Sequence, residues 1–212
     1  MLWSAVHEER RRLADDLERL SDADRRRPSL CPGWDVHDVV AHLVDSAVAT
    51  RRSFVVDLLR ARGDFDQANE RGIARHRRER PRDTCRALRD VADHCTTPPA
   101  PLATRLVEAV VHGEDVRRPL RIERRYPAEA VRAALEHQLG TSVRWGGGRE
   151  RAASLRLVDR ASGDSWGEGP EVVAEAVDLL LAVSGRPIAA GLATGPGASR
   201  LLGGAAAEGR TR

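Results

Sequence analysis

A mainly α protein is predicted for this chain of 212 residues, with a four-helix bundle first and a small α+β portion after it. Two features of the sequence favour this fold class. Within the first 120 residues, apolar side chains recur at helical spacing in four segments, which gathers them on one face of each helix. Beyond Pro119 the pattern changes, because SLRLVDR at 154–160 alternates apolar and polar side chains as a half-buried strand does.

The domain boundaries follow from these patterns. We expect the helical bundle over residues 1–120, the α+β portion over 121–190 and a disordered tail over 191–212. The tail is rich in Gly and Ala, so it offers little apolar surface to bury against a core.

Four helices are expected in the bundle because four segments each have their own apolar face. They cover residues 3–20, 35–60, 82–95 and 102–117. Asp35 can cap the second helix, and Asp38 favours the free N–H groups of its first turn. Pro119 stops the fourth helix. The polar, arginine-rich residues 63–80 are expected to form a loop or a weak helix. Four helices joined by short or moderate loops suggest a bundle.

The C-terminal portion combines helices with a short hairpin. A helix is expected at 128–139. The strand at 154–160 is followed by the turn ASGD, so Ser165–Glu168 can pair back on it as a second short strand. A last helix is expected at 170–184, because Gly185 follows it and glycine commonly ends helices.

The composition is that of a folded protein and gives no sign of a nucleic-acid surface. Hydrophobic residues make up 41% and charged residues 32%, which is too apolar for general disorder. All 35 basic residues are arginine and the formal net charge is +3, a bias that fits a GC-rich genome. Acidic residues stand close to the arginine runs, whereas a nucleic-acid surface needs a segregated basic stripe or stacking aromatics. We therefore expect no nucleic-acid partner.

The cysteines and the apolar segments indicate the compartment. Cys31, Cys85 and Cys95 form neither a CxxC pair nor an even-numbered disulfide framework. The N-terminal MLWSAVHEERRR lacks the apolar segment of a signal peptide, and no apolar stretch reaches membrane-spanning length. These features predict a cytoplasmic protein with reduced thiols and no membrane partner. Whether Cys31 has a role beyond packing stays open.

A candidate metal site consists of His42 in VVAHLVD and of Glu108 and His112 in RLVEAVVHGED. Four residues apart on a helix, Glu108 and His112 project from one face as neighbours. Imidazole and carboxylate are common ligands of zinc and related divalent ions. Three protein ligands leave a coordination position open, which is the pattern of catalytic rather than structural sites.

The faces that carry these three residues lie opposite the main apolar arcs of their helices. Ser46, Ala49 and Ser53 continue the face of His42, and their small side chains leave room for a ligand. By itself, E-x-x-x-H on a helix is more often a solvated pair than a metal site, so the spacing leaves both interpretations open. Other catalytic motifs are missing: the sequence contains no H-E-x-x-H, no Walker loop and no G-x-S-x-G.

Three segments in the same order carry a resemblance to a known family. They are LCPGWDVHDVVAHLV, VEAVVHGEDVRRPL and LRLVDRASGDSWGEGPEVVAEAVDLLLAVSGRP. They resemble, in turn, the pGW-to-histidine segment, the E-x-x-x-H-G-x-D signature and the C-terminal portion of the mycothiol-dependent maleylpyruvate isomerase-like family. Members of that family have a DinB-like four-helix bundle. The likeness spans about residues 5–190.

The resemblance implies cofactors and a type of chemistry. His42, Glu108 and His112 stand at the metal-ligand positions of the family, whose metal is typically zinc. Many relatives use mycothiol, a thiol cofactor of actinobacteria, and the arginine-rich composition fits that origin. A divalent ion stabilises a coordinated thiolate, and this metal-bound thiolate would attack a small electrophilic substrate as the nucleophile. The reaction expected from the resemblance is an isomerisation or a thiol S-transfer.

The substrate is less well defined by the sequence. The C-terminal portion is short compared with that of the founding isomerase, and a substrate-binding arginine expected there cannot be assigned. Arg117, Arg118 and Arg121 follow the candidate metal helix and are candidates to bind a substrate carboxylate, with surface ion pairing as the alternative.

Two functions therefore remain open. The first is a zinc- and mycothiol-dependent enzyme that binds a small thiol and an electrophile, as a monomer or a homodimer. It requires an open metal position and a pocket that reaches it. The second is a non-catalytic metal-binding or protein-interaction bundle of the same fold.

Overall fold

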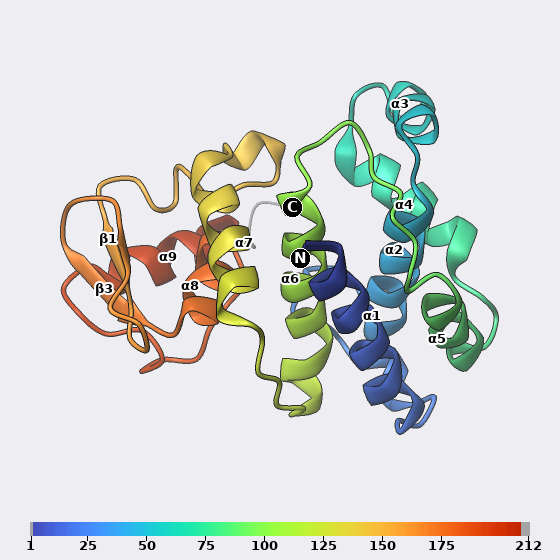
Figure 1. Cartoon of the computed structure of the whole chain (residues 1–212), viewed down its shortest axis with the longest axis horizontal. Helices are drawn as coiled ribbons and strands as arrows, with labels where there is room; N and C mark the ends of the chain where they lie inside the picture. Colours follow the sequence, from blue (N-terminus) through green and yellow to red (C-terminus); the bar gives the residue numbers. More distant parts are fainter. Residues whose placement is uncertain (1, 209–212) are drawn as a thin grey trace. The chain divides into compact units, whose positions relative to one another are not determined.

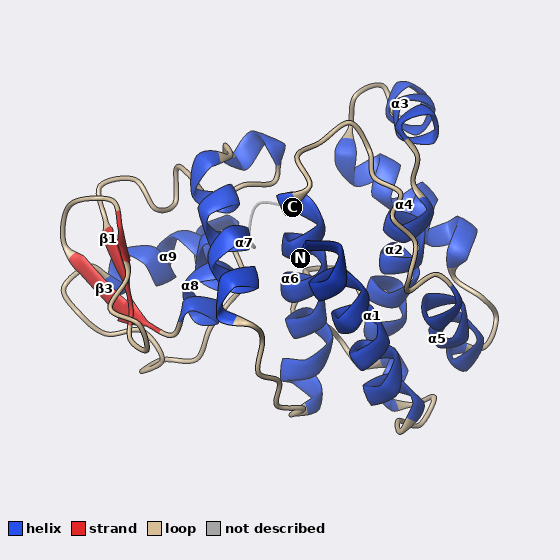
Figure 2. Cartoon of the chain, in the orientation of Figure 1, coloured by secondary structure: helices blue, strands red, loops and turns tan. Residues whose placement is uncertain are grey.

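The computed structural model describes the backbone of residues 2–208 and the side chains of residues 2–203. The chain folds into two compact units, residues 1–125 and residues 126–212. Helices dominate the described part, and its named strands all belong to the second unit (Figure 1, Figure 2). The predicted fold class, mainly α with a small α+β C-terminal portion, is confirmed.

The described part of the first unit contains six α-helices and one 3₁₀ turn. They are α1 (Leu2–Glu18), η1 (Asp24–Arg26), α2 (Val36–Val48), α3 (Arg51–Arg60), α4 (Phe65–His76), α5 (Pro81–Asp90) and α6 (Ala103–Leu120). Both α1 and α2 pack against α5 and α6, so these four helices form the bundle (Figure 1). Helix α4 also packs on α2, and α3 contacts α4.

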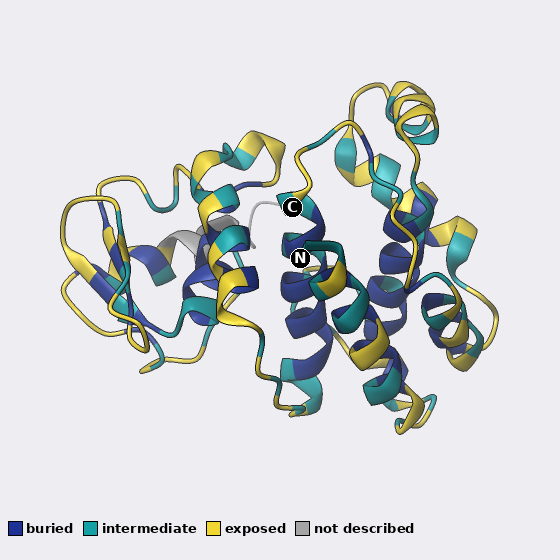
Figure 3. Ribbon diagram, viewed as in Figure 1, coloured by how far each residue is buried: buried dark blue, intermediate teal, exposed yellow. Residues whose placement is uncertain are grey.

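The core of the bundle is built from the apolar faces of α1, α2, α5 and α6. Its buried side chains are Leu13, Leu17, Val36, Val39, Val40, Leu43, Val44, Cys85, Leu88 and Val116. Figure 3 shows the buried ribbon along α2 and α6, in contrast to the exposed ribbon of α3. Full burial of one such Val or Leu side chain contributes about 1.5–3 kcal/mol, so these faces fix how α2 and α6 lie against each other.

The helix predicted over 35–60 is interrupted, which corrects that prediction. Ala49 has an extended backbone (ψ 120°), and Thr50 begins α3 with a capping box. The Thr50 hydroxyl accepts the Ser53 N–H at 3.1 Å, and the Ser53 hydroxyl accepts the Thr50 N–H at 2.9 Å. Such a pair satisfies the free N–H groups of a new helix start, which makes the break locally stable. Ser53 therefore belongs to another helix than His42.

Helix α4 occupies most of residues 63–80, where the sequence predicts a loop or a weak helix. Asp64 caps it by accepting the Gln67 N–H at 3.0 Å, and Ile73 is buried on its inner face. The apolar face was missed because the segment FDQANERGIARH carries so few large apolar side chains. The spacing of apolar residues in this segment only weakly indicates a helix, and packing against α2 stabilises it.

Helix α6 continues past Pro119 to Leu120, although the sequence predicts a stop there. A proline inside a helix leaves the carbonyl four residues earlier without its usual donor, and here that carbonyl belongs to Asp115. The Asp115 oxygen accepts the Leu30 N–H at 3.0 Å instead. Arg121, in the left-handed conformation with φ 58°, then ends the helix. The loop before α2 is thus tied to α6 close to His112.

The second unit joins helices to a three-stranded sheet. Its described elements are α7 (Ala128–Gly140), η2 (Val143–Trp145), β1 (Arg156–Asp159), β2 (Ser165–Trp166), β3 (Glu171–Ala174), α8 (Ala176–Val183) and α9 (Ala198–Glu208). The strand order is β2-β1-β3, with β1 antiparallel to β2 and parallel to β3. Helix α8 packs against α7, α9 and β1.

Two predictions for this unit are corrected. The helix expected over 170–184 begins only at Ala176, because Val172 and Ala174 alternate with more exposed neighbours in β3 and are buried on one side of the sheet. Residues 198–208 form α9 instead of belonging to the disordered tail predicted over 191–212. Leu201 is buried, and α9 packs against α8 and β3, contacts that composition alone does not reveal. Residues 209–212 lie outside the described part.

The described residues contain neither a membrane-spanning helix nor a disulfide. No helix there combines the length and the apolar character needed to cross a bilayer. Among the described residues, no disulfide joins Cys31, Cys85 or Cys95, and Cys85 is buried whereas Cys95 is exposed.

Candidate metal centre

The packing of α2 on α6 brings His42, Glu108 and His112 together. One potential ligand atom from each residue lies within 4.8 Å of the others. His42 Nε2 is 3.1 Å from Glu108 Oε2, and His112 Nε2 is 3.8 Å from the same oxygen. The imidazole rings meet edge to face, with centroids 4.8 Å apart. A single carboxylate is therefore shared between two imidazoles from different helices.

Access to this cluster is from the side of Glu108. The side chains of His42 and His112 are 9% and 11% exposed, whereas that of Glu108 is 27% exposed. Two surface hollows, of about 380 and 520 Å³, lie along α3, α4 and their connection, and none of the cluster residues lines them. They are therefore not the pocket that an open metal position requires.

Asp115 orients the His112 ring. Its carboxylate is fully buried, and Oδ2 lies 2.9 Å from His112 Nδ1. An anionic carboxylate can only accept a hydrogen bond, so Nδ1 carries the proton when His112 is neutral. The lone pair of the neutral ring is then on Nε2, the nitrogen nearest to Glu108. Carboxylate–histidine pairs of this kind commonly support metal-binding imidazoles.

Glu108 is held in its anionic form. Burial alone would raise the pKa of Glu108, but the attraction and hydrogen bond of His42 oppose it, together with the charges of His112 and Arg105. These favourable contacts prevail and hold the pKa of Glu108 well below its ordinary value. Glu108 is thus an anionic group between the two imidazoles.

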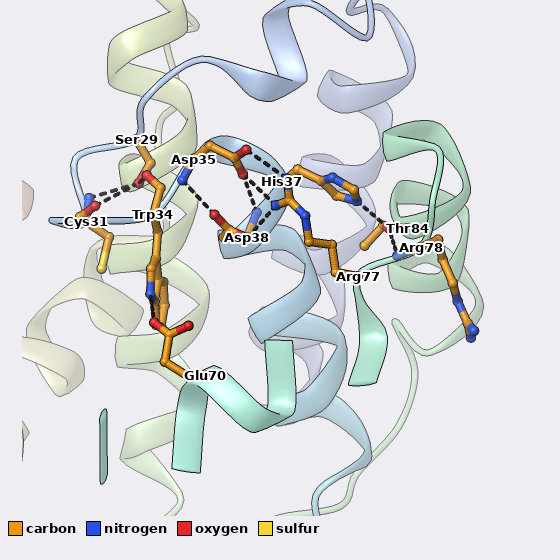
Figure 4. A network of polar contacts seen from close by, with 10 residues as sticks. All are labelled: Ser29, Cys31, Trp34, Asp35, His37, Asp38, Glu70, Arg77, Arg78 and Thr84. Atoms are coloured by element: carbon orange, nitrogen blue, oxygen red, sulfur yellow. Dashed lines mark hydrogen bonds and ion pairs between the residues drawn. The ribbon is translucent and has the colours of Figure 1, made fainter. Parts of the chain in front are cut away.

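Trp34 forms a wall of the cluster that the sequence analysis did not assign. Its ring centroid lies 5.1 Å from that of His42 and 6.2 Å from that of His112. The indole N–H donates to Glu70 of α4 at 2.8 Å, which fixes the ring (Figure 4). The only signal in the sequence was the Pro-Gly-Trp run directly before α2. An apolar ring on this side excludes water from both imidazoles.

A short turn presents Trp34 to the cluster. The Ser29 hydroxyl donates to the Trp34 carbonyl at 2.8 Å and accepts the Cys31 N–H at 3.0 Å (Figure 4). Gly33 has φ +81°, a conformation that favours glycine. Because the turn is closed by its own hydrogen bonds, the position of the indole ring is set before any ligand arrives.

The N-terminus of α2, which follows this turn, is anchored by charges. Asp35 and Asp38 form a capping box, and the Arg77 guanidinium bridges both carboxylates (Figure 4). Burial alone would raise the pKa of Asp35, but the hydrogen bonds from Arg77 and from the Asp38 N–H lower it. The cap predicted from the sequence is present, and it fixes the start of the helix that carries His42.

The room expected beside His42 is filled. Ser46 is buried, and its hydroxyl accepts a hydrogen bond from Arg105 Nη1 at 2.8 Å. Ala49 ends α2, and Ser53 caps α3. The small side chain of Ser46 thus leaves room for the Arg105 guanidinium. This contact joins two helices, so the pattern of a single helix could not predict it.

The three arginines predicted to bind a substrate carboxylate are placed differently from one another. Arg117 is completely buried, and its guanidinium pairs with Glu9 at 3.3 Å and Asp16 at 2.8 Å. Arg118 pairs with Glu114 at 2.7 Å, and Arg121 is the exposed cap of α6. The ion pairs of Arg117 and Arg118 match the alternative of structural pairing, so the geometry gives the substrate role no support.

The residues present fit a divalent metal ion. Two imidazoles and one carboxylate are the protein ligands of a well-known class of catalytic zinc site. The Nε2 atoms of His42 and His112 lie 3.1 and 3.8 Å from the same Glu108 oxygen, so the three donor groups face one another. The donor set, the anionic state of Glu108 and the support from Asp115 are all those of a metal-binding cluster.

Comparison with known families identifies the N-terminal unit. Residues 6–100 match the family described as the mycothiol maleylpyruvate isomerase N-terminal domain. These residues are similar to that domain. The matched segment contains His42 and Trp34 and ends before Glu108, so the resemblance predicted from the sequence is confirmed at the level of the family.

Solved structures extend the likeness to the whole fold. The mycothiol-dependent maleylpyruvate isomerase matches with a TM-score of 0.63 and 16% identity, over 92% of this chain and 91% of that one. A histidine-to-alanine mutant of that isomerase matches with the same TM-score and coverage at 15% identity. A search of curated proteins finds no match. At this identity the likeness establishes the fold, and the near-equal coverage gives no support to a shortened C-terminal portion.

Proposed function

We propose that this protein is an enzyme that depends on a divalent metal, with zinc as the expected ion, and on mycothiol as its thiol cofactor. The substrate is a small electrophile, and the reaction is an isomerisation or a thiol S-transfer. One observation carries the proposal: the convergence of His42, Glu108 and His112 from two helices. The family of residues 6–100 supports the thiol.

The residues of the chain have separate tasks in this proposal. His42, Glu108 and His112 would hold the ion, which supplies one kind of chemistry: it stabilises a thiolate near neutral pH and so provides a nucleophile. Asp115 keeps the lone pair of neutral His112 on Nε2. Trp34 keeps water from one side of both imidazoles. The exposed side of Glu108 leaves a direction from which a thiol can approach.

Elemental analysis tests the metal site first. We expect about one zinc per chain in the wild-type protein, and loss of the zinc in the His42→Ala, Glu108→Ala and His112→Ala variants, each of which should keep its helical circular dichroism. The matched control is Glu114→Ala, which removes a neighbouring carboxylate of α6 that pairs with Arg118. A wild-type protein without metal after reconstitution would contradict the proposal.

A turnover assay then tests the thiol chemistry. Zinc-loaded protein, mycothiol and a panel of small electrophiles should give turnover that depends on both zinc and thiol. The same assay with Glu108→Ala and His112→Ala should give none. Turnover that persists in these variants would exclude the cluster as the reaction site.

A further inference from the structure

Arg10 is a charged residue at a core position of α1. Val6 and Leu13, its neighbours on the same face, are buried, and Arg10 itself is only 5% exposed. Its Nη1 donates to the carbonyl oxygens of Ala92 at 3.5 Å and His94 at 2.9 Å. These carbonyls accept hydrogen bonds but do not neutralise the charge of the guanidinium.

Arg105 is a second buried guanidinium, on α6. It precedes Glu108 by three residues, so the two share a face of the helix, and it is also 5% exposed. Its Nη1 donates to the Ser46 carbonyl at 3.2 Å and to the Ser46 hydroxyl at 2.8 Å, and its Nε donates to the Thr104 hydroxyl at 3.3 Å. All these partners are neutral.

Within the described part of the chain, neither Arg10 nor Arg105 forms an ion pair. This is unusual, because buried charges are normally paired. Arg117 in the same bundle shows the usual arrangement, with the carboxylates of Glu9 and Asp16 beside it. Burial lowers the pKa of Arg10 to about 10, and repulsion by Arg105 acts in the same direction. Contacts of the intervening segments place the two side chains in one region. Arg10 donates to the His94 carbonyl, Thr96 two residues further on donates to the Ala47 carbonyl, and Arg105 donates to the adjacent Ser46.

The region of both arginines adjoins the metal cluster. Arg105 lies one helical turn before Glu108 on α6, and its partner Ser46 lies one turn after His42 on α2. The charge of Glu108 interacts with Arg10 and with Arg105. When a divalent ion is held at the cluster, the carboxylates of Glu108 and Asp115 balance its two charges. A metal-bound thiolate would add one negative charge, so at least one of the two positive charges of Arg10 and Arg105 stays uncompensated in a largely buried region, which attracts an anion.

The free ends of both guanidinium groups have unused hydrogen-bond donors. The Nη2 atoms of Arg10 and Arg105 make no hydrogen bond within the described part of the chain, and they are not among its buried unpartnered atoms. Each Nη2 therefore keeps some surface open to solvent. Two accessible N–H donors next to a cluster of potential metal ligands are suited to a carboxylate, which arginine binds with charge-assisted hydrogen bonds.

We propose that Arg10 and Arg105 form an anion subsite beside the metal cluster, which binds a carboxylate group of the electrophilic substrate. This inference deepens the proposed function and rests on it for the neighbouring ion. It makes the substrate an anion and gives the protein a means of selection, because a neutral analogue leaves both buried charges without a partner.

Binding of a small dicarboxylate tests the subsite. Malonate is the probe, and malonamide, which has a similar shape and no charge, is the matched ligand control. Isothermal titration calorimetry at constant ionic strength is applied to zinc-loaded wild type and to Arg10→Met, Arg105→Met and Arg105→Lys. Arg86→Met, which removes an exposed arginine of α5, is the matched protein control. Zinc content and thermal unfolding are measured on the same samples.

We expect malonate but not malonamide to bind the wild type and Arg86→Met. Each methionine variant should bind malonate at least about tenfold more weakly with its zinc content unchanged, since each loses a charge-assisted hydrogen bond. Arg105→Lys should bind with intermediate affinity. Without malonate, the methionine variants should unfold at the same temperature as the wild type or higher, because replacing an unpaired buried charge removes its desolvation cost.

Different failures separate the inference from the proposed function. Zinc-loaded wild type that does not bind malonate, or methionine variants that bind it as the wild type does, would overturn the subsite and leave the metal site intact. Protein that takes up no zinc but binds malonate through Arg10 and Arg105 would support the subsite and contradict the proposed function. A methionine variant that unfolds at a much lower temperature than Arg86→Met would show that its arginine is structural, against the inference.

Discussion

Asp115 acts on the candidate metal centre through the tautomer of His112. Replacement by asparagine removes the negative charge that keeps the proton on Nδ1. We therefore expect Asp115→Asn to weaken zinc binding by about 10- to 100-fold, the usual effect of losing such a supporting carboxylate. Competition with a fluorescent zinc chelator measures this.

The control for Asp115 is its neighbour in sequence. Glu114→Gln makes the same acid-to-amide change on α6, but Glu114 pairs with Arg118. Zinc affinity should stay close to that of the wild type in this variant. Equal zinc affinity in Asp115→Asn and Glu114→Gln would show that Asp115 does not support His112.

His37 makes the stability of the bundle depend on pH. Its side chain is buried, with Nε2 2.7 Å from the Thr84 hydroxyl (Figure 4). That hydroxyl also accepts the Arg78 N–H, so its own proton is available for Nε2 of a neutral ring. Burial, and next the charge of Arg77, lowers the pKa of His37 from 6.5 to about 4.

The direction of the pH effect follows from this shift. Between pH 6.5 and 4 the unfolded chain binds a proton at His37 and the folded chain does not, so stability is fully present above pH 6.5 and falls as the pH falls. The loss amounts to about 2–3 kcal/mol. Urea unfolding at several pH values should show it in the wild type and in His94→Gln, an exposed control, but not in His37→Gln. A similar pH slope in both variants would refute the assignment.

At the scale of elements, Gly72 determines how closely α4 approaches α2. A methyl group at this position would collide with the carboxylate of Asp45. Asp45 cannot easily move, because Arg75 and His76 hold it at 3.2 and 3.3 Å. We expect Gly72→Ala to destabilise the protein by about 1–3 kcal/mol, the usual cost of overpacking.

Gly140 is the matched control for this substitution. It is also helical, at the end of α7, but a methyl group there meets no other atom. Gly140→Ala should leave stability unchanged or raise it by up to about 1 kcal/mol, since alanine loses less backbone entropy than glycine. Urea denaturation of both variants measures the difference. A Gly72→Ala protein as stable as Gly140→Ala would show that α2 and α4 can move apart without loss of stability.

At the scale of the whole molecule, every residue of the candidate site belongs to the first unit. The ligands, Asp115 and Trp34, as well as Arg10 and Arg105, all precede the boundary after Arg125. The core of the bundle is likewise built from residues of this unit. We therefore expect a chain of residues 1–125 to keep its helical circular dichroism and to bind zinc with an affinity close to that of the full chain. Loss of zinc binding in a folded 1–125 chain would show that the second unit contributes to the site.

The spacing of apolar and polar residues correctly predicted features that depend on a single helix or strand. It placed helices over most of the bundle, the Asp35 cap of α2 and the strands β1 and β2 of the second unit, but not β3. It also selected His42, Glu108 and His112, because charged and imidazole side chains opposite an apolar arc stand out in a helical pattern. Their role as metal ligands stays a prediction, but their convergence is a feature of the structure.

Predictions from the spacing of apolar residues were wrong where a contact with another element determines whether a helix forms or where it ends. The break at Ala49 depends on a capping pair, α4 on packing against α2, and α9 on burial of Leu201. The extension of α6 past Pro119 depends on Leu30, which satisfies the carbonyl that proline leaves free. In each case the local sequence favoured another structure, and contacts with residues far away in the sequence stabilised the observed one.

The sequence by itself determined the fold class and the chemistry that the site can offer, because periodicity and side-chain type are properties of the chain. Only the tertiary structure decided which groups share that site. It brought Trp34 onto both imidazoles, set Asp115 behind His112 and placed two unpaired guanidinium groups beside Glu108. The physical reason is that helix packing places residues far apart in the sequence next to one another, and the strength of an electrostatic interaction depends on distance and burial.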